Sequence, residues 1–294
     1  MHTPVLLQES LSFLEPKKNE NFIDATFGLG GFSLALCQYL MPNGKILAFE
    51  WDPYLFKLGV AKLQNTIMNK NIKIVNKNFR QIKNIVKKEN FTHIKGVIFD
   101  LGISNWHYQN AKRGFSFQKD EPLDMRINPQ EIKITAFDVI NYSSFEKLVE
   151  IFQEYGEERD SKKIAKAIVS QRKNKKIETS KELAELIVAA KKNKRKKIHP
   201  ATQVFMALRS FVNQELVNLE VGLKSAYDVL DKGGRIVVIS FNGLEDRVIK
   251  KVFKTLKYEK KAKIMTKNAV KPTKNEILNN PKARSAKLRA IMKT

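Results

Sequence analysis

The sequence predicts an α/β fold, a doubly wound parallel sheet that is interrupted by a helical insertion. In the first hundred residues, short apolar runs alternate with helix-like segments, and this alternation is typical of βαβ units. After residue 100, the next convincing strand begins only at Gly234. A βαβ crossover takes about 30 residues, so roughly 100 further residues must form an insertion between these two strands.

Strands are expected at residues 22–27, 45–50, 72–75 and 96–100. Residues 33–40 read as a helix that follows the first of them. Asp52 followed by Pro53 is a favourable N-cap and first-turn pair, so another helix is expected to begin there. A fifth strand is expected at residues 234–241, after a turn.

The insertion is expected to be helical, because residues 145–152 and 164–169 have helix-like patterns and strand signals are few. The predicted domains follow from this assignment. They are a discontinuous Rossmann-like sheet domain, residues 1–108 and 200–294, and an inserted helical substrate domain, residues 109–199.

Three further features of the sequence lie in the insertion and where the chain leaves it. Residues 191–197 are six basic side chains and one Asn, and a solvated exit loop is expected there. Residues 202–230 read as one long helix that returns to the sheet. Asp124 and Arg126 are close enough in sequence to orient one another, and no further role follows for this pair.

Composition indicates a globular protein that needs no disulfide. Hydrophobic residues make up 43% of the 294 and charged residues 29%. The single cysteine, Cys37, excludes an intramolecular disulfide, and the four histidines are not paired at ligand spacing, so no metal is expected. Since there is no apolar run of about 18 residues and no signal-peptide pattern, a soluble cytoplasmic protein is expected.

Positive charge is concentrated in two segments. Lys and Arg number 54 against 30 Asp and Glu, a formal net charge of +24. Residues 159–200 carry 15 basic and 4 acidic side chains, and residues 247–294 carry 16 and 2, so the rest of the chain is nearly neutral. Basic segments beside a neutral body favour a polyanionic partner, a nucleic acid. The alternative is a lysine-rich surface that reflects biased codon use.

Residues 24–31 form a glycine-rich turn between the first strand and the first helix. Glycine lets the backbone approach a ligand closely, and the N-terminus of a helix offers free N–H groups. Glu50 lies at the end of the second strand, 20 residues after Gly30, where a carboxylate can accept hydrogen bonds from the hydroxyls of a ribose. Together these features favour an adenosine cofactor over an ordinary tight turn.

Two positions indicate which adenosine cofactor it is. A dinucleotide fingerprint requires a third glycine at position 33, where this chain has Ser33, so an oxidoreductase is disfavoured. Asp24, ahead of the glycines, suits the amino and carboxylate end of S-adenosylmethionine better than a pyrophosphate. Asp52 competes with Glu50 for the ribose, although capping of the next helix is the simpler role for Asp52.

Side chains that suit a nucleobase follow the fourth strand. Asp100 and several aromatic rings gather in residues 100–108 and 113–117, and the carboxyl ends of parallel strands face the ligand crevice. These groups could hold and stack a base. The alternative is that Phe115 and Phe117 are core residues of the insertion.

Ordered blocks along nearly the whole chain resemble one known family. They are residues 2–7, 24–28, 100–104, 113–117, 122–126, 155–159, 199–202, 240–241, 244–247 and 280–289. In these blocks the chain is similar to the bacterial 16S ribosomal RNA (cytosine-N4) methyltransferases, which modify the exocyclic N4 of a cytidine near the decoding centre. The resemblance implies a Rossmann-like S-adenosylmethionine-dependent methyltransferase sheet with an inserted helical substrate domain.

The resemblance also implies a cofactor, a partner and a set of site residues. The cofactor is S-adenosylmethionine, and the partner is 16S ribosomal RNA in the small ribosomal subunit. No membrane partner is expected, and a homodimer is a further expectation. The implied cofactor contacts are Gly30, Gly31, Phe32, Glu50, Phe79, Asp100 and His107. Asp100 is also the candidate catalytic residue, unless it is occupied with the cofactor. Cytosine N4 is a poor nucleophile, and a carboxylate that accepts an N4 hydrogen would activate it.

The chain departs from the family pattern at several positions. Phe32 stands where the family has His, Glu50 where it has Asp, and residues 105–107 are Asn-Trp-His instead of Ser-Pro-Gln. Residues 242–243 are Asn-Gly instead of His-Ser, and Glu121 replaces a Gly. These departures motivate a second hypothesis, an RNA-binding assembly protein that keeps the fold with weak or lost catalysis.

Overall fold

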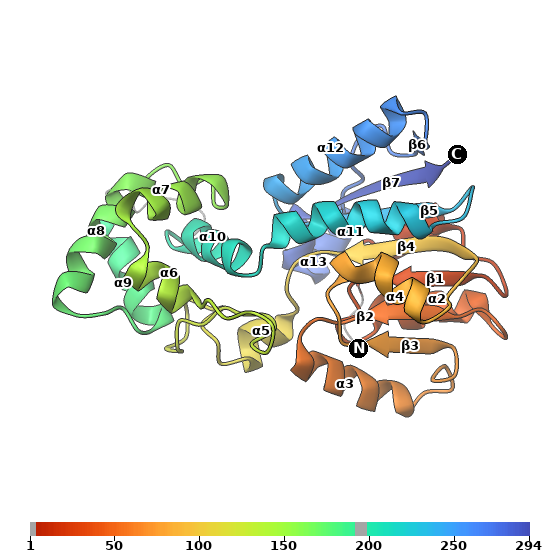
Figure 1. Ribbon diagram of the computed structural model, residues 1–294, viewed down its shortest axis with the longest axis horizontal. Coiled ribbons are helices and arrows are strands. Elements are labelled where there is room, and N and C mark those ends of the chain that lie inside the picture. Colours follow the sequence, from red (N-terminus) through yellow and green to blue (C-terminus); the bar gives the residue numbers. More distant parts are fainter. Residues whose placement is uncertain (1–3, 192–198) are drawn as a thin grey trace. The chain divides into compact units, whose positions relative to one another are not determined.

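The computed structural model describes residues 4–191 and 199–294, and it divides into two compact units. The sheet unit comprises the chain up to Gly102 and from Leu216 onward, and the helical unit comprises residues 103–215. The predicted α/β class with a helical insertion is confirmed (Figure 1). The sequence-based domain boundaries fall after residues 108 and 199, whereas the two units divide after residues 102 and 215.

The sheet unit contains one seven-stranded sheet with the strand order β3-β2-β1-β4-β5-β7-β6. Its strands are β1 (Asn21–Asp24), β2 (Ile46–Phe49), β3 (Ile72–Val75), β4 (Ile94–Asp100), β5 (Arg235–Ser240), β6 (Ala262–Ile264) and β7 (Lys287–Lys293). Strands β1 to β5 are parallel, as expected, whereas β7 runs antiparallel to β5 and β6.

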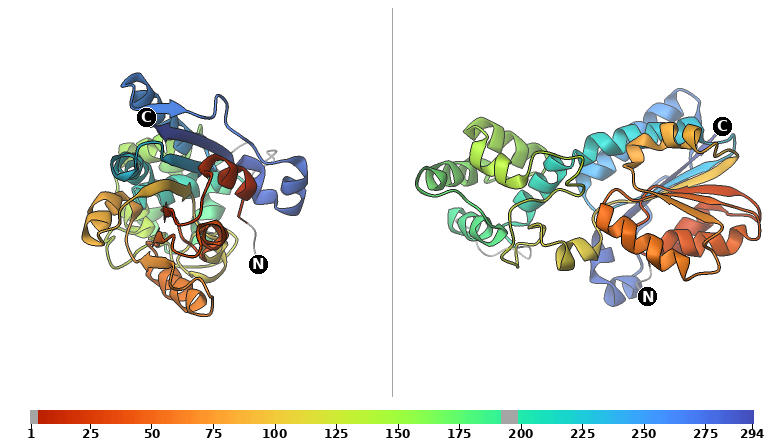
Figure 2. Two further views of the ribbon diagram at one scale, coloured as in Figure 1. Left: turned by 90° about the vertical axis from the view of Figure 1, so that its right-hand side faces the viewer. Right: turned by 60° about the horizontal axis from the view of Figure 1, so that its bottom comes forward.

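Helices cover both faces of this sheet (Figure 2). The helices of this unit are α1 (Leu7–Leu14), α2 (Gly31–Leu40), α3 (Pro53–Gln64), α4 (Ile82–Lys88), α11 (Glu215–Val229), α12 (Gly243–Tyr258) and α13 (Lys274–Asn279), with the 3-10 turns η1 (Phe79–Gln81) and η2 (Pro281–Ser285). The N-cap predicted for α3 is confirmed, because the Asp52 carboxylate accepts hydrogen bonds from the N–H groups of Tyr54 and Leu55.

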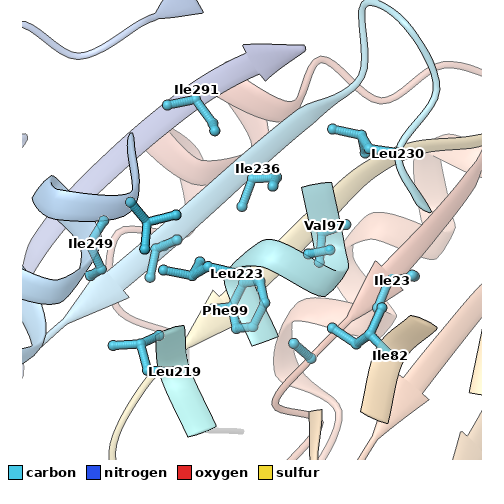
Figure 3. Close-up of a cluster of buried hydrophobic side chains, with 14 of the residues drawn as sticks. Ile23, Ile82, Val97, Phe99, Leu219, Leu223, Leu230, Ile236, Ile249 and Ile291 are labelled. Atoms are coloured by element: carbon cyan, nitrogen blue, oxygen red, sulfur yellow. The ribbon is translucent and has the colours of Figure 1, made fainter. Parts of the chain in front are cut away.

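Alternate residues of each strand point to opposite faces and so build two separate cores. On one face, Ile23, Val97 and Phe99 pack against Leu223 of α11 and Ile249 of α12, and all five are fully buried (Figure 3). The opposite face is covered by α1, α2 and α3, whose apolar side chains bury the neighbouring strand residues. Because both faces are buried, the strands β1, β2, β4 and β5 in the interior of the sheet read as largely apolar runs.

The helical unit has its own apolar core. Its helices are α5 (Asn105–Asn110), α6 (Ala136–Tyr142), α7 (Phe145–Glu154), α8 (Ser161–Asn174), α9 (Ser180–Ala190) and α10 (Thr202–Val212). Capping boxes start two of them, Thr135 with Asp138 at α6 and Thr179 with Glu182 at α9, and each satisfies two backbone N–H groups.

The prediction of one long helix over residues 202–230 is wrong. The segment forms α10 and α11, and Gln214 between them has a left-handed backbone with φ 50°. The buried side chain of Asn213 donates to the carbonyl oxygen of Met125 and accepts from the N–H of Ile127. These bonds tie the break to the helical unit, so α10 packs there rather than on the sheet.

The prediction of a solvated exit loop is wrong for its first residue. Lys191 is buried, and its Nζ donates to the Glu158 carboxylate at 2.5 Å and to the Pro200 carbonyl oxygen at 2.6 Å. The Glu158 side chain is only 1% exposed, so a partner with opposite charge is needed for its burial. The rest of the expected loop, residues 192–197, lies outside the described residues.

Part of the C-terminal basic segment is structural. The sequence patterns do not predict β6 or β7, because lysines are interspersed with the apolar residues there. Within β7, Leu288 and Ile291 are fully buried, and the Arg289 guanidinium donates to both carboxylate oxygens of Asp246. The Lys293 ammonium donates to the carbonyl oxygens that end α11. These cations therefore join β7 to α12 and to the end of α11.

Within residues 4–191 and 199–294, no helix combines the length and the apolar character that crossing a membrane requires. The same part of the chain contains no group of three or more His, Cys, Asp or Glu side chains arranged to hold a metal ion. The sulfur of Cys37 is a buried free thiol.

Candidate active site

Three acidic side chains lie at the carboxyl ends of neighbouring parallel strands. Asp24 ends β1, Glu50 directly follows β2, and Asp100 ends β4. Strands β2 and β4 lie on opposite sides of β1, so the strand order reverses here, and such a switch point opens a crevice for ligands. The structure thus brings together three acids that the sequence singled out one by one.

The turn that joins β1 to α2 needs glycine at two positions. Gly28 has φ 57° and Gly30 has φ 83°, both in the left-handed region. A Cβ atom at Gly28 would meet no atom within 4 Å, whereas one at Gly30 would lie 2.9 Å from the ring of Phe27. At the start of α2, the N–H groups of Gly31 and Phe32 have no acceptor within the helix. Open backbone beside a helix N-terminus suits a nucleoside ligand.

Asp24 is fully buried under this turn. One of its carboxylate oxygens accepts from the Ser33 hydroxyl at 2.7 Å and the other from the Thr26 N–H at 3.0 Å. Burial raises the pKa of Asp24 to about 6, and these hydrogen bonds oppose a larger shift. The serine that stands in place of a third glycine therefore has a role, because its hydroxyl holds the carboxylate of Asp24.

The Glu50 carboxylate closes the glycine turn from the neighbouring strand. Its Oε2 accepts from the Gly28 N–H at 2.9 Å, and its Oε1 accepts from the Asp52 N–H at 2.8 Å. Burial raises the pKa of Glu50 to about 8, and the charges of Asp52 and Asp24 add to the shift. Each oxygen keeps a second lone pair, so the carboxylate can still accept a ribose hydroxyl.

Asp100 differs from the other two acids in its hydrogen bonding. Its backbone N–H donates to the Thr26 hydroxyl at 2.7 Å, which fixes the end of β4 against β1. Its Oδ1 atom is buried and has no hydrogen-bond partner among the described residues. Burial raises the pKa of Asp100 to about 8, and the charges of Asp24 and Glu245 act in the same direction. A buried acceptor without a partner is costly and indicates that a ligand supplies one.

Two aromatic residues of the predicted cofactor set have different surroundings. Phe32 is 4% exposed and packs in the apolar core under α2, so its backbone is the part that can meet a ligand. Phe79 is partly exposed, and its ring lies edge-on to Phe99 with centroids 5.5 Å apart. Gly222 on α11 makes room for this ring, since a Cβ there would lie 2.6 Å from it.

His107 belongs to the helical unit, and its contact with a cofactor stays a prediction. It is 4% exposed, and its ring lies edge-on to the rings of Trp106 and Phe115, with centroid distances of 5.7 and 5.3 Å. Phe115 is itself a buried core residue of the helical unit, so the alternative weighed for it is correct. Phe117 is partly exposed and packs against the same core.

Side-chain hydrogen bonds hold the loop around residues 122–126 in place. Arg126 binds both carboxylate oxygens of Asp124, at 2.8 and 2.7 Å, so the expected orientation of this pair is confirmed. Arg113 donates to the carbonyl oxygen of Arg126, and Glu121 accepts from the N–H of Gly114 at 3.0 Å. The Glu that replaces a family Gly thus closes this loop.

The sequence patterns do not single out two residues that complete the acidic site. Thr26 joins Asp24 and Asp100, as described above. Glu245 is buried near the start of α12 and accepts from the N–H of Phe241 at 2.8 Å, while the Asn242 side chain accepts from the N–H of Glu245. A capping signature, Asn followed three residues later by Glu after a strand, is the signal that could have identified Glu245.

Comparison with known proteins gives a consistent result. The family model described as the MraW methylase family matches residues 1–294. A protein of Ehrlichia canis (strain Jake) named Ribosomal RNA small subunit methyltransferase H is 42% identical, with all of both chains covered. Proteins of the same name from Persephonella marina and Caldicellulosiruptor bescii are 41% and 39% identical. The alignment with the Persephonella protein covers 98% of this chain and 97% of that protein. The alignment with the Caldicellulosiruptor protein covers 99% of each chain.

Proposed function

This chain belongs to the MraW methylase family, and on that premise we propose that it methylates the exocyclic N4 of a cytidine in small-subunit (16S) ribosomal RNA. It is an S-adenosylmethionine-dependent methyltransferase. The names of the full-length relatives support the substrate. The geometric observation that carries the proposal is the buried Oδ1 of Asp100, which has no partner in the described part of the chain and lies at the strand end that faces the crevice.

The residues of the sheet unit fit S-adenosylmethionine. The open backbone at Gly28 leaves space for a ligand, and the N–H groups of Gly31 and Phe32, which have no acceptor within α2, follow it in the same turn. We propose that Glu50 binds the ribose, that Phe79 contacts the base, and that the buried acids favour the positive end of the cofactor. Bound in this way, S-adenosylmethionine supplies a methyl group on a positively charged sulfur.

The chemical task of the protein is to make a poor nucleophile react. The lone pair of cytosine N4 is delocalised into the ring, so the amine must be held in line with the methyl group, which is mainly catalysis by proximity. We propose that the free oxygen of Asp100 accepts a hydrogen bond from N4, which raises electron density on the nitrogen, and takes the proton that N4 loses when it gains the methyl group. Thr26 positions Asp100 by accepting its backbone N–H.

The alternative of an assembly protein without turnover is not favoured. The phenylalanine that replaces a family histidine at position 32 is accommodated in the core. Asn242 replaces another histidine and caps α12 through the N–H of Glu245. These departures therefore fit the fold, and the acids at the strand ends are all present.

Three further proposals concern the state of the substrate, the place of action and the oligomeric state of the protein. We propose that the substrate is the RNA within the small ribosomal subunit, that the protein acts in the cytoplasm, and that it forms a homodimer. Sedimentation of the purified protein, alone and with small subunits, tests the first and the third of these.

The proposed activity is tested by transfer of a labelled methyl group. Wild-type protein is incubated with labelled S-adenosylmethionine and small ribosomal subunits that lack the modification. Label in the small-subunit RNA is the expected result. Label that enters large subunits equally well, or a protein that binds the cofactor and transfers nothing, contradicts the proposal.

Substitutions in the glycine turn are expected to weaken cofactor binding. Gly28→Ala places a methyl group in the open space beside the backbone, which should cost about 1–3 kcal/mol of binding free energy. Both residues have a left-handed backbone, so each substitution should lower the melting temperature, and Gly30→Val should lower it more because its side chain also meets Phe27. Calorimetry and thermal unfolding separate the two effects. Unchanged S-adenosylmethionine affinity in both folded variants would refute the assignment of this turn.

Replacing Lys192, Lys194, Arg195, Lys196 and Lys197 by Gln is expected to weaken RNA binding. The slope of log affinity against log salt should fall by about 0.7–0.9 for each phosphate that the variant no longer neutralises. Lys191 is left unchanged, because breaking a buried ion pair typically costs about 3–5 kcal/mol. Cofactor affinity serves as the control and should not change. If the salt slope stays the same, this run is only a solvated surface.

A further inference from the structure

The helical unit carries an exposed aromatic stack that the proposed reaction does not use. The ring of His199 lies flat on the ring of Phe117, with centroids 4.4 Å apart and an interplanar angle of 8°. Phe117 is in turn supported edge-on by Phe205, which is 5% exposed in the core of the unit. His199 itself is exposed, and the protein backs the face of its ring that stacks on Phe117.

The orientation of the His199 ring is fixed by the backbone N–H of Ala201. Its Nδ1 accepts a hydrogen bond from the N–H of Ala201 at 3.2 Å, so in the neutral ring Nε2 carries the proton. The carbonyl oxygen of Pro200, the next residue, accepts from the buried ammonium of Lys191. Both bonds hold the segment before α10 in place. An ordered flat surface loses little conformational entropy when a ligand binds to it.

Hydrogen bonds connect the turn that carries Arg159 to the segment that follows His199. The turn that carries Arg159 is held to α10 by the Gln203 side chain, which donates to the carbonyl oxygen of Glu157 at 3.2 Å. It is also held by Glu158, which shares the ammonium of Lys191 with Pro200. Arg159 is exposed and makes no ion pair among the residues that the structure describes.

Helix α8, which follows this turn, presents a row of lysines. Lys162, Lys166 and Lys173 are exposed and have no ion-pair partner in the described ranges. At about 100° per residue, these positions fall within roughly 40° of one another around the helix, so they form one stripe. Unpaired cations in a row match the repeating charges of a nucleic-acid backbone.

We propose that the His199–Phe117 stack is a platform for an unpaired nucleobase of the substrate RNA, with Arg159 and the lysine stripe of α8 binding flanking phosphates. The inference rests on the proposed function and adds a base-binding site in the helical unit. Flat rings that stack single-stranded bases, beside cations that bind the backbone, are the usual means of holding single-stranded RNA. An acidic peptide would use the cations and would gain little from the flat ring.

Two substitutions separate stacking from a structural role. His199→Asn removes the ring and keeps a side-chain oxygen that can accept the Ala201 N–H in an Asx turn. His199→Phe keeps the flat ring and removes that acceptor. If the ring is a base platform, the Asn variant should bind a single-stranded RNA oligonucleotide roughly 5- to 150-fold more weakly than wild type, and the Phe variant should bind within a few-fold of it.

The probes and controls make the outcome unambiguous. Binding is measured with the RNA oligonucleotide and with an abasic oligonucleotide of the same length, on which the Asn variant and wild type should not differ. The melting temperature of the Asn variant and the S-adenosylmethionine affinity of both variants should match wild type. Wild-type affinity of the Asn variant for RNA, an equal loss on the abasic probe, or a stronger loss in the Phe variant each overturns the platform. If wild type neither binds nor methylates small subunits, the proposed function itself has failed.

Discussion

Replacing Asp100 by Asn is expected to lower the single-turnover rate of methyl transfer by about 100-fold or more, the usual contribution of a positioned proton acceptor. The amide keeps the size of the side chain, but it cannot carry the negative charge that would polarise the N–H bond of cytosine N4. RNA affinity and cofactor affinity are measured in parallel. RNA affinity should stay near wild type, because the basic segments lie elsewhere in the sequence.

The same variant is expected to be more stable than wild type without ligand at alkaline pH. The pKa of Asp100 is about 8 in the folded protein and near 4 when unfolded, so the folded protein binds more protons between these values and loses stability as pH rises through them. Asn has no such loss. Its melting temperature should exceed that of wild type by at least about 2 °C at pH 8.5, and by less at pH 6.

A matched control uses an acid outside the site. Asp228 on α11 is exposed and pairs with Lys83, so Asp228→Asn should leave the transfer rate unchanged. A near-normal single-turnover rate in Asp100→Asn would show that Asp100 is structural and that the mechanism is wrong.

Affinity for S-adenosylmethionine is expected to rise between pH 6 and pH 8.5. The pKa values of Glu50 and Asp100 are both raised to about 8, so the empty site holds protons at neutral pH. A positively charged ligand favours the ionised carboxylates, and binding should therefore release protons. The remaining charged groups that act on these two carboxyls, Asp24, Asp52 and Glu245, are also acids and add to the effect.

The product provides the control, because the sulfur of S-adenosylhomocysteine is uncharged. Calorimetry at several pH values, in buffers with different ionisation enthalpies, counts the protons released by each ligand. Affinity should rise by at most roughly tenfold per pH unit for each proton released, and the slope should be smaller for the product. Equal slopes for the two ligands, or no slope for either, contradict the proposed role of these acids.

The parallel strands and the acids at their ends are predictable from the sequence. Each buried strand is a short apolar run, and Asp24, Glu50 and Asp100 stand where such a run ends. Burial on both faces produces those runs, so the pattern survives without knowledge of tertiary contacts. The glycines of the first turn carry a similar local signal, since a left-handed backbone favours glycine at Gly28 and Gly30.

The features that the sequence did not reveal depend on contacts between distant residues. Lys191 belongs to a run of basic residues, and only the partner Glu158 shows that it is buried. The break after α10 depends on Asn213, whose side chain bonds to residues 125 and 127. The stack of His199 on Phe117 joins residues 82 positions apart, so no local pattern could indicate it.

The position of the added methyl group is the most direct test of the central claim. Small ribosomal subunits that lack the modification are incubated with wild-type protein and S-adenosylmethionine, and the RNA is digested and mapped by mass spectrometry. The account predicts N4-methylcytidine at one cytidine of 16S ribosomal RNA, and its absence when Asp100→Asn replaces wild type. A methyl group on carbon 5, on a ribose or on another base would contradict it.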